Sequence, residues 1–245
     1  MPAVRFLSHA LTHVGLVRRR NEDACVDRRD IGLWAVADGM GGHEAGDVAS
    51  GRIVAALGEL DRSGDLDATV SACAARLREV DAELRERAAM LGPAAVIAST
   101  VVVLLADDRE YACVWAGDSR LYRWRDGDLL QLTKDHSAVQ ELVDAGRLTA
   151  AEATRHPSSH IVTRAIGGGR LQFGHLRGPL QIDDWFLLCS DGLTNMLGDA
   201  EIANELARAK APAQAAGRLL DGVLERGAID NVTIVIVAAE PAERP

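Results

Sequence analysis

The chain has 245 residues, of which 48% are hydrophobic and 26% charged, and this ordinary globular composition excludes a mainly disordered or fibrous protein. Its 27 lysine and arginine residues against 36 aspartate and glutamate residues give a net charge of −9, which argues against general affinity for nucleic acid or an anionic membrane. The length suits one domain covering residues 1–245.

Targeting and redox features point to the cytoplasm. The four cysteines (Cys25, Cys73, Cys113 and Cys189) lie far apart and form no C-x-x-C pair, so a reducing compartment is expected. The N-terminal residues lack the basic-then-apolar order of a signal peptide, and no apolar run of about 18 residues could span a bilayer. We expect a cytoplasmic monomer with no membrane partner.

The first half of the chain is predicted to begin with short strands at residues 4–14, 23–28 and 31–37. The spacing of Val48, Ile53 and Leu57 predicts a helix over about 44–60. After Asp65, apolar residues recur at helical intervals with charged residues between them, and they predict an amphipathic helix that reaches about Met90.

The second half begins with a strand-rich segment at 99–106, 111–118, 119–125 and 128–133, followed by a polar stretch at 134–160 with a helix at 138–145. Strands are then predicted at 161–165, 171–177 and 184–190, helices at 199–208 and 212–226, and a last strand at 232–239. Because the strands follow one another without alternating helices, mainly antiparallel sheets with helices packed outside fit this order best.

Four aspartates mark the ends of apolar strands. Asp38 and Asp191 follow such strands and precede glycine, Asp118 follows a strand and a glycine, and Asp230 comes just before the last strand. If these carboxylates lie ~5 Å apart, each ionised pair costs roughly 3 kcal/mol at an effective dielectric constant near 20. Bound cations would remove this cost, and oxygen ligands without histidine or cysteine favour Mg²⁺ or Mn²⁺.

An anionic substrate also needs a cationic group. Arg18, Arg19 and Arg20 stand just ahead of Glu22 and Asp23, and the guanidinium group matches the geometry of phosphate oxygens. Together with a pair of divalent ions, such an arginine suits the hydrolysis of a phosphate ester.

Seven blocks of sequence resemble, in order and spacing, the metal-dependent protein phosphatases of type 2C in their compact bacterial form. They are GLVRRRNEDA (15–24), VADGMGGHEAG (36–46), AGDSRLYRWRDG (116–127), LTKDHS (132–137), TRAIG (163–167), LLCSDGL (187–193) and DNVTIVIV (230–237). The resemblance implies an α+β fold, a four-layer αββα sandwich of two mainly antiparallel sheets flanked by helices. It also implies that the stretch 134–160 is a variable flap beside the active site.

The resemblance further implies a centre of two Mn²⁺ or Mg²⁺ ions, with a third, weaker site. The implied ligands are Asp38, the Gly39 carbonyl, Asp191 and Asp230, with Asp118 for the third ion. Arg18 is the implied phosphate-binding residue, and Glu22 and Asp23 are expected to orient waters around the metals.

The activity implied by the resemblance is hydrolysis of phosphoserine and phosphothreonine in proteins by a metal-activated water, opposing a bacterial Hanks-type kinase. The expected partners are that kinase and its phosphorylated substrates. The proton donor for the leaving alkoxide stays open between His43, His160 and a metal-bound water, because Met40 occupies the position where animal relatives carry a histidine.

Other phosphatase chemistries fit less well. No cysteine is followed by the C-x₅-R pattern, and the string Asp65-Leu66-Asp67-Ala68-Thr69 lacks the preceding strand that an aspartate-nucleophile phosphatase needs, so it predicts a helix N-cap. Two alternatives stay open. One is a pseudophosphatase that binds phosphoproteins without turning them over, and the other is a regulatory phosphatase of anti-anti-sigma-type proteins.

Overall fold

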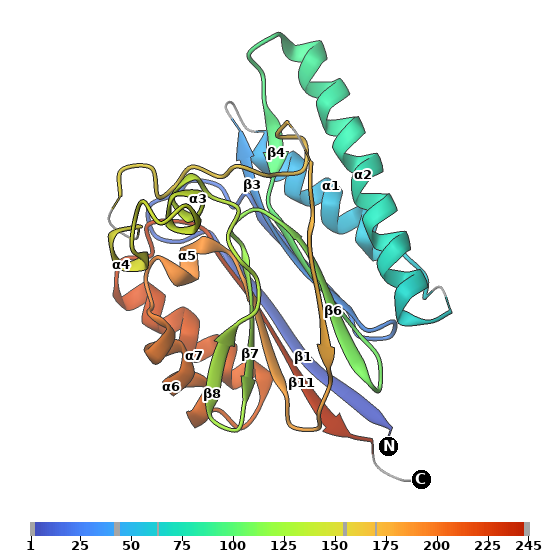
Figure 1. Ribbon diagram of the computed structural model, residues 1–245. Helices are drawn as coiled ribbons and strands as arrows, with labels where there is room; N and C mark the ends of the chain where they lie inside the picture. Colours follow the sequence, from blue (N-terminus) through green and yellow to red (C-terminus); the bar gives the residue numbers. More distant parts are fainter. Residues whose placement is uncertain (1–2, 42–44, 63, 154–155, 170, 243–245) are drawn as a thin grey trace.

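The computed structural model describes residues 3–41, 45–62, 64–153, 156–169 and 171–242. Two antiparallel sheets pack face to face and helices cover their outer faces, so the layers follow the order helix, sheet, sheet, helix (Figure 1). This arrangement confirms the predicted α+β sandwich. Within the described ranges, no helix has the length and apolar character needed to cross a membrane.

One sheet has five strands and the other has six. The five-stranded sheet has the order β1 (Val4–His13), β11 (Val232–Pro241), β10 (Trp185–Cys189), β7 (Arg120–Arg125) and β8 (Asp128–Gln131). The six-stranded sheet has the order β2 (Asp23–Arg28), β3 (Leu33–Gly41), β5 (Val101–Ala106), β6 (Glu110–Ala116) and β9 (Gly174–Pro179), with β4 (Ile97–Ser99) beside β3.

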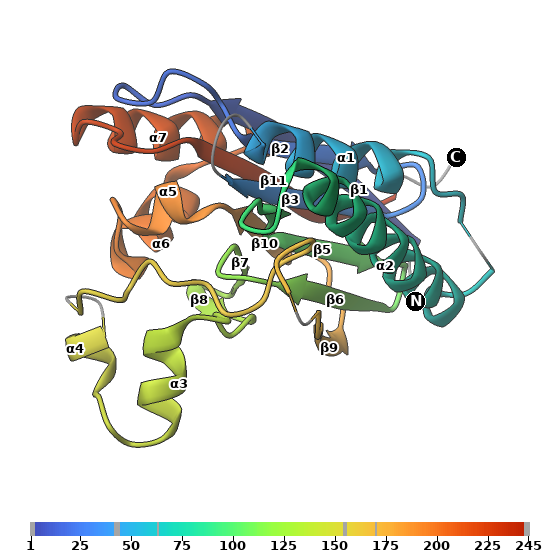
Figure 2. The same cartoon turned by 90° about the horizontal axis from the view of Figure 1, so that it is seen from above.

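The helices form two groups on opposite sides of the sandwich. On the six-stranded sheet lie α1 (Gly46–Gly58) and α2 (Leu66–Leu91), and on the five-stranded sheet lie α5 (Asp191–Thr194), α6 (Asp199–Arg208) and α7 (Pro212–Glu225). The short helices α3 (Ala138–Asp144) and α4 (Ala150–Ala153) lie outside both helical layers (Figure 2).

Alternation along the central strands divides the core into three apolar layers. On β3, Leu33 and Ala35 face the helices α1 and α2, whereas Trp34 and Val36 face the other sheet. Strand β11 repeats the pattern. Its alternate residues face either the helices on the five-stranded sheet or the space between the two sheets. Because these strands are buried on both faces, they appear in the sequence as continuous apolar runs.

Two element predictions need correction. Residues 161–165 were expected to form a strand, but they are irregular backbone that makes a single isolated bridge, between Ser137 and Val162. The strand expected at 171–177 begins and ends later, as β9. The N-cap predicted at Asp65 is confirmed, because its side chain accepts a hydrogen bond of 2.8 Å from the Ala68 backbone N–H.

The segment 134–160, expected to be a flap, has its two ends bonded together, and its first end also contacts the sandwich. The Ala138 N–H donates to the Ile161 carbonyl at 2.9 Å, and the Thr163 N–H donates to the His136 carbonyl at 2.8 Å. The His136 ring stacks on Trp115 with a centroid distance of 5.7 Å. The segment between these fastenings carries α3 and α4, and its residues contribute little to the three apolar layers.

Candidate active site

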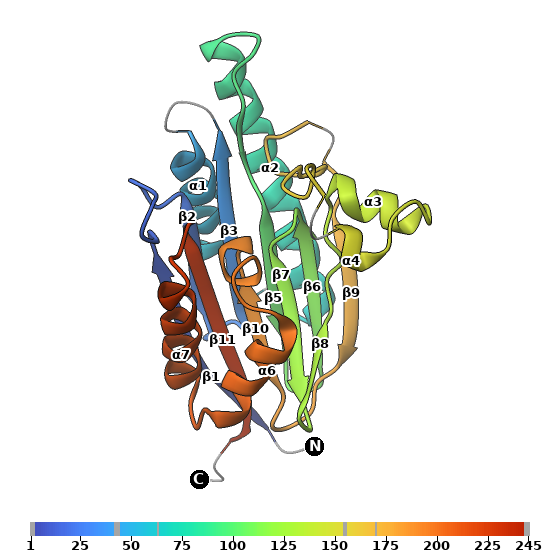
Figure 3. The same cartoon turned by 90° about the vertical axis from the view of Figure 1, so that its left-hand side faces the viewer.

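The antiparallel topology brings the acidic residues to one end of the sandwich. Strands β3, β6 and β10 run toward that end, and β2 and β11 start from it, as Figure 3 shows with the two chain termini at the opposite end. Asp38 lies near the end of β3, Asp118 lies between β6 and β7, and Asp191 opens α5 directly after β10. Asp230 comes just before β11, so residues from the whole chain meet there.

Backbone and hydroxyl contacts fix the position of Asp38. Asp38 pairs with Asp23 across β2 and β3. Its N–H donates to the Thr100 hydroxyl at 3.1 Å, and its carbonyl accepts from the Thr100 N–H at 2.8 Å. The Thr100 hydroxyl is also bonded to the Ser119 hydroxyl at 2.7 Å, which joins the strand end of Asp38 to the turn that carries Asp118. Two of the acidic positions are therefore coupled by side chains.

The crowding of acidic groups raises the pKa of several carboxyls. Asp38 keeps part of its surface exposed, yet burial is the first cause that raises its pKa well above the usual value, followed by the charges of Asp23 and Asp191. Burial, reinforced by the charge of Asp191, raises the pKa of Asp118 to about 7. The pKa of Asp191 is raised as well, first by burial and then by Asp230. These groups are close enough to oppose each other's ionisation.

Arg18 contacts the same cluster from the loop between β1 and β2. Its guanidinium donates to an Asp230 carboxylate oxygen at 2.8 Å, and the side chains of Arg18 and Asp230 are 55% and 34% exposed. The hydrogen bond and charge of Asp230 raise the pKa of Arg18. Because this ion pair is exposed, we expect it to contribute little to stability and to open readily toward a ligand.

The structure places Glu22 and Asp23 behind the strand ends. Asp23 is only 8% exposed and accepts a hydrogen bond of 2.7 Å from the Ser190 hydroxyl, and burial raises its pKa to about 6. The Glu22 carboxylate lies beside the start of α1. A Cβ added to Gly46 would stand 2.9 Å from a Glu22 carboxylate oxygen and 2.8 Å from the Gly39 carbonyl oxygen. Glycine therefore keeps space open beside these two oxygens.

Asn231 is a residue of the site that the sequence analysis did not single out. Its side-chain N–H groups donate to the Val14 and Arg20 carbonyls, both at 2.9 Å, and its side-chain oxygen accepts from the Glu22 N–H at 2.9 Å. These bonds fasten the loop that carries Arg18 to the strand that follows Asp230. The only sequence signal is the position of Asn231 directly after an acidic residue at the start of an apolar strand.

Replacing Asn231 by alanine should loosen this loop. Asn231 is 7% exposed, so the change leaves buried backbone groups without partners and should destabilise the protein by about 2–3 kcal/mol. We expect a lower thermal midpoint and a higher KM for a phosphate ester. Asn204 is exposed on α6, and Asn204→Ala serves as the control, which should leave both values unchanged. Wild-type KM and midpoint in Asn231→Ala would contradict the assigned contact.

Of the two histidines predicted as proton donors, the structure describes only His160. His160 is exposed in a turn at the end of the segment 134–160, and His43 lies outside the described residues. His136 is held instead as a structural group. Its Nδ1 faces the Gly117 N–H at 3.3 Å and its Nε2 faces Arg164 at 3.2 Å, and burial together with Arg164 lowers its pKa to about 4.

The donor set of this site fits hard divalent cations. It offers carboxylate oxygens and a backbone carbonyl, and the space left open by Gly46 lies beside two of these oxygens. Among the described side chains, no three acidic, histidine or cysteine groups already converge as the ligands of one ion. Arg18 is bonded to Asp230, and Ser190 is bonded to Asp23. A cation would therefore compete with Arg18 for Asp230, and it would relieve the repulsion that raises the pKa of Asp38.

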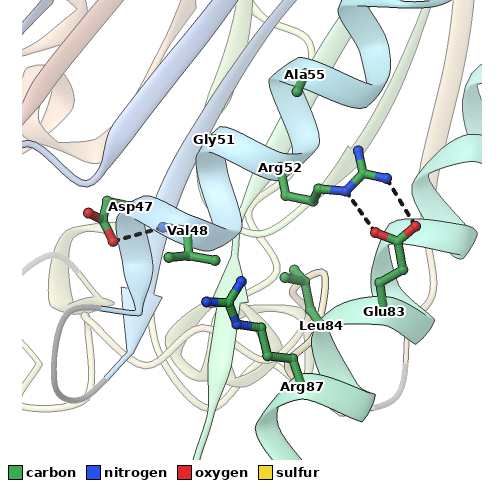
Figure 4. A pocket seen from close by; sticks show the side chains of 8 residues that line it. All are labelled: Asp47, Val48, Gly51, Arg52, Ala55, Glu83, Leu84 and Arg87. Atoms are coloured by element: carbon green, nitrogen blue, oxygen red, sulfur yellow. Dashed lines mark hydrogen bonds and ion pairs between the residues drawn. The ribbon is translucent and has the colours of Figure 1, made fainter.

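A separate pocket of about 480 Å³ lies between α1 and α2 (Figure 4). Its acidic groups already have partners. Glu83 receives two hydrogen bonds from Arg52, at 2.7 and 3.0 Å, and Asp47 accepts one from the Val48 N–H at 2.8 Å. None of the four strand-end aspartates lines this pocket. The carboxylates whose mutual repulsion bound cations would relieve are thus those at the strand ends, not those of this pocket.

Comparisons with known proteins agree with this geometry. Residues 16–223 match the family model described as protein phosphatase 2C. A solved structure described as PppA, a key regulatory component of T6SS in Pseudomonas aeruginosa, has a TM-score of 0.90 at 40% identity and covers 98% of this chain and 100% of that chain. The catalytic domain of the serine/threonine protein phosphatase PstP, solved in complex with 2 manganese ions, has a TM-score of 0.85 at 35% identity, with coverages of 97% and 99%.

The same relative is found by sequence. The serine/threonine protein phosphatase PstP of Mycobacterium tuberculosis is 38% identical over 225 residues, which is 91% of this chain and 43% of that protein. The chain thus spans less than half the length of this curated relative. The matched blocks, the two-sheet sandwich and the family model agree with one another. The chain belongs to the protein phosphatase 2C family.

Proposed function

We propose that the protein is a metal-dependent phosphatase that hydrolyses phosphoserine and phosphothreonine in proteins. The observation that carries the proposal is the contact of Arg18 with Asp230 at the edge of a cluster of mutually repelling carboxyls. A phosphate group needs a cationic partner, and the carboxyls need cations of their own. Relatives named as serine/threonine phosphatases over nearly the whole chain support the substrate class.

The ligands proposed for Mn²⁺ or Mg²⁺ are Asp38, the Gly39 carbonyl, Asp191 and Asp230, with Asp118 for a third ion. Support for a pair of ions comes from the two manganese ions in the similar PstP structure. When bound, such ions supply an activated water and stabilise charge on the phosphoryl oxygens. We propose this ligand set for one domain that comprises the sandwich and its flap at 134–160.

The chain's own residues have separate tasks. Arg18, which is exposed and bonded only at its tip, is proposed to release Asp230 and bind two phosphoryl oxygens of the substrate. Glu22 and Asp23 are proposed to accept hydrogen bonds from waters at the site, with Asp23 held in place by Ser190. The leaving alkoxide needs a proton. His160, exposed on the flap, and His43 are the side chains proposed to supply it.

The reaction returns a phosphorylated side chain to its free hydroxyl. The protein would therefore oppose the kinase that phosphorylates the same substrates, and we propose a Hanks-type kinase in that role.

The activity can be tested with the purified full chain. We expect it to release phosphate from a phosphothreonine peptide when Mn²⁺ is present, to lose this activity in EDTA and to regain it when Mn²⁺ is returned. Hydrolysis that continues unchanged in EDTA would remove the metal-dependent proposal. Binding of the phosphopeptide without any release of phosphate would instead indicate a phosphoprotein-binding pseudophosphatase.

A further inference from the structure

Three large apolar side chains lie exposed beside Arg18 and Asp230. Leu16 is 63% exposed, Val17 65% and Ile229 59%. We call these three residues the apolar rim. They come from two loops, one between β1 and β2 and the other between α7 and β11, which are more than 200 residues apart in sequence. Single exposed apolar residues are ordinary, whereas a group of them gathered at a site indicates contact with another molecule.

The apolar rim is held in place by backbone contacts. The Leu16 N–H donates to the Ala228 carbonyl at 2.8 Å. Gly15 has a φ of +79°, and a Cβ there would stand 2.2 Å from the Asp230 carbonyl oxygen, so only glycine allows the two loops to approach this closely. These contacts hold the two loops of the rim against each other.

The position of the apolar rim beside Arg18 indicates which kind of molecule binds there. Val17 and Ile229 directly precede Arg18 and Asp230, whose side chains are bonded at 2.8 Å. A phosphorylated protein segment that brings its phosphate to Arg18 therefore comes within reach of these apolar side chains. Arg19 is exposed on the same loop and adds positive charge beside the rim. This combination suits a phosphorylated segment that also carries an apolar residue.

We infer that the apolar rim binds an apolar side chain of the phosphoprotein substrate, located within a few residues of the phosphoserine or phosphothreonine. This inference rests on the proposed function and adds a determinant of substrate choice to it. The rim is outside the carboxylate cluster, so it contributes to binding and takes no part in the hydrolysis itself. Burying one such side chain in the complex should improve kcat/KM about tenfold, mainly through KM.

Matched peptides test the substrate side of the inference. A set of phosphothreonine peptides carries leucine at one position between −3 and +3, and each has a partner with serine at that position. With Mn²⁺ present, wild-type protein should hydrolyse at least one leucine peptide with a kcat/KM about tenfold above that of its serine partner. Equal values at every position would overturn the inference.

Variants test the protein side. In the double variant Val17→Ser with Ile229→Ser, the preference for leucine should disappear. Hydrolysis of p-nitrophenyl phosphate, which has no neighbouring peptide residues, should stay within twofold of wild type and shows that the variant is folded and active. Leu130 is 49% exposed on β8, near the opposite end of the sandwich, and Leu130→Ser is the matched control, which should keep the preference.

Two results would count against the inference. A double variant that keeps the leucine preference would show that other residues recognise the peptide. If wild-type protein instead dimerises in sedimentation and the double variant is a monomer with unchanged peptide kinetics, the rim is an interface between copies of this chain. Failure of the proposed function looks different, because wild-type protein would then hydrolyse neither the peptides nor p-nitrophenyl phosphate with Mn²⁺.

Discussion

Replacing Asp38 by asparagine is expected to abolish Mn²⁺-dependent hydrolysis while making the metal-free protein more stable. Asp38 lies at the centre of the carboxylate cluster, and the charges of Asp23, Asp191, Asp118 and Asp230 all raise its pKa. Loss of a group that stabilises transition-state charge, in this case through bound cations, should reduce kcat by about 10³-fold or more. Asparagine has nearly the same shape and carries no charge.

The gain in stability follows from the removal of repulsion. In the metal-free protein at pH 8, Asp38 must either hold a proton or repel its neighbours, and each unit of raised pKa is equivalent to about 1.4 kcal/mol. Each kcal/mol gained would raise the thermal midpoint by roughly 2–4 °C for a domain of this size. Thermal unfolding in EDTA, followed by circular dichroism, measures the effect.

An exposed aspartate provides the control for this experiment. Asp221 on α7 is exposed, and Asp221→Asn should change neither the activity nor the midpoint. If Asp38→Asn kept wild-type activity, Asp38 could not be a metal ligand. If it lowered the midpoint in EDTA, the repulsion argued for the cluster would be wrong.

The metal-free protein should lose stability as the pH rises from about 5 to 8. Burial and neighbouring charges raise the pKa of Asp23 to about 6 and that of Asp118 to about 7, and they also raise the pKa values of Asp38 and Asp191. Between the usual aspartate value near 4 and these raised values, the folded state binds more protons than the unfolded chain. The free energy of unfolding therefore falls as the pH rises through that window.

The comparison with Mn²⁺ separates this effect from general pH sensitivity. Thermal midpoints recorded in EDTA should fall from pH 5 to pH 8, whereas saturating Mn²⁺ should raise the midpoint most at pH 8, where the carboxylates are ionised and free to bind it. Below about pH 4 the trend should reverse, because arginine partners lower the pKa of Asp30 and Glu201. A midpoint in EDTA that increases steadily from pH 5 to 8 would contradict the raised pKa values.

Much of the fold could be predicted from local sequence patterns. Strands such as β3 and β11, buried on both faces, produce continuous apolar runs, and α2 shows its buried face at helical intervals. The strand predicted at 161–165 was wrong for an equally local reason. Ile161 and Val162 suggested a strand, but the segment is held by single bonds to Ala138 and His136, and among the described residues no strand pairs with it.

The site was predictable only in part. The aspartates could be found because each stands where an apolar strand ends or begins, and the antiparallel order then carries them to the same end. Asn231 and Ser190 act through hydrogen bonds to segments more than 160 residues away in sequence. Residue spacing and hydrophobic periodicity within a segment carry no information on such long-range contacts. The apolar rim could not be predicted, because the sequence does not show whether an apolar residue in a loop is buried in the core or exposed.

The pairing of β1 with β11 along their whole lengths, from Val4 with Pro241 to His13 with Val232, has a consequence for biosynthesis. During synthesis β1 has to wait for β11, because its pairing partner is made much later. Asp230 is made just before β11, so a nascent polypeptide interrupted ahead of residue 230 lacks both that strand and an acidic group of the carboxylate cluster. Chains interrupted at that point should accordingly lack the activity proposed above.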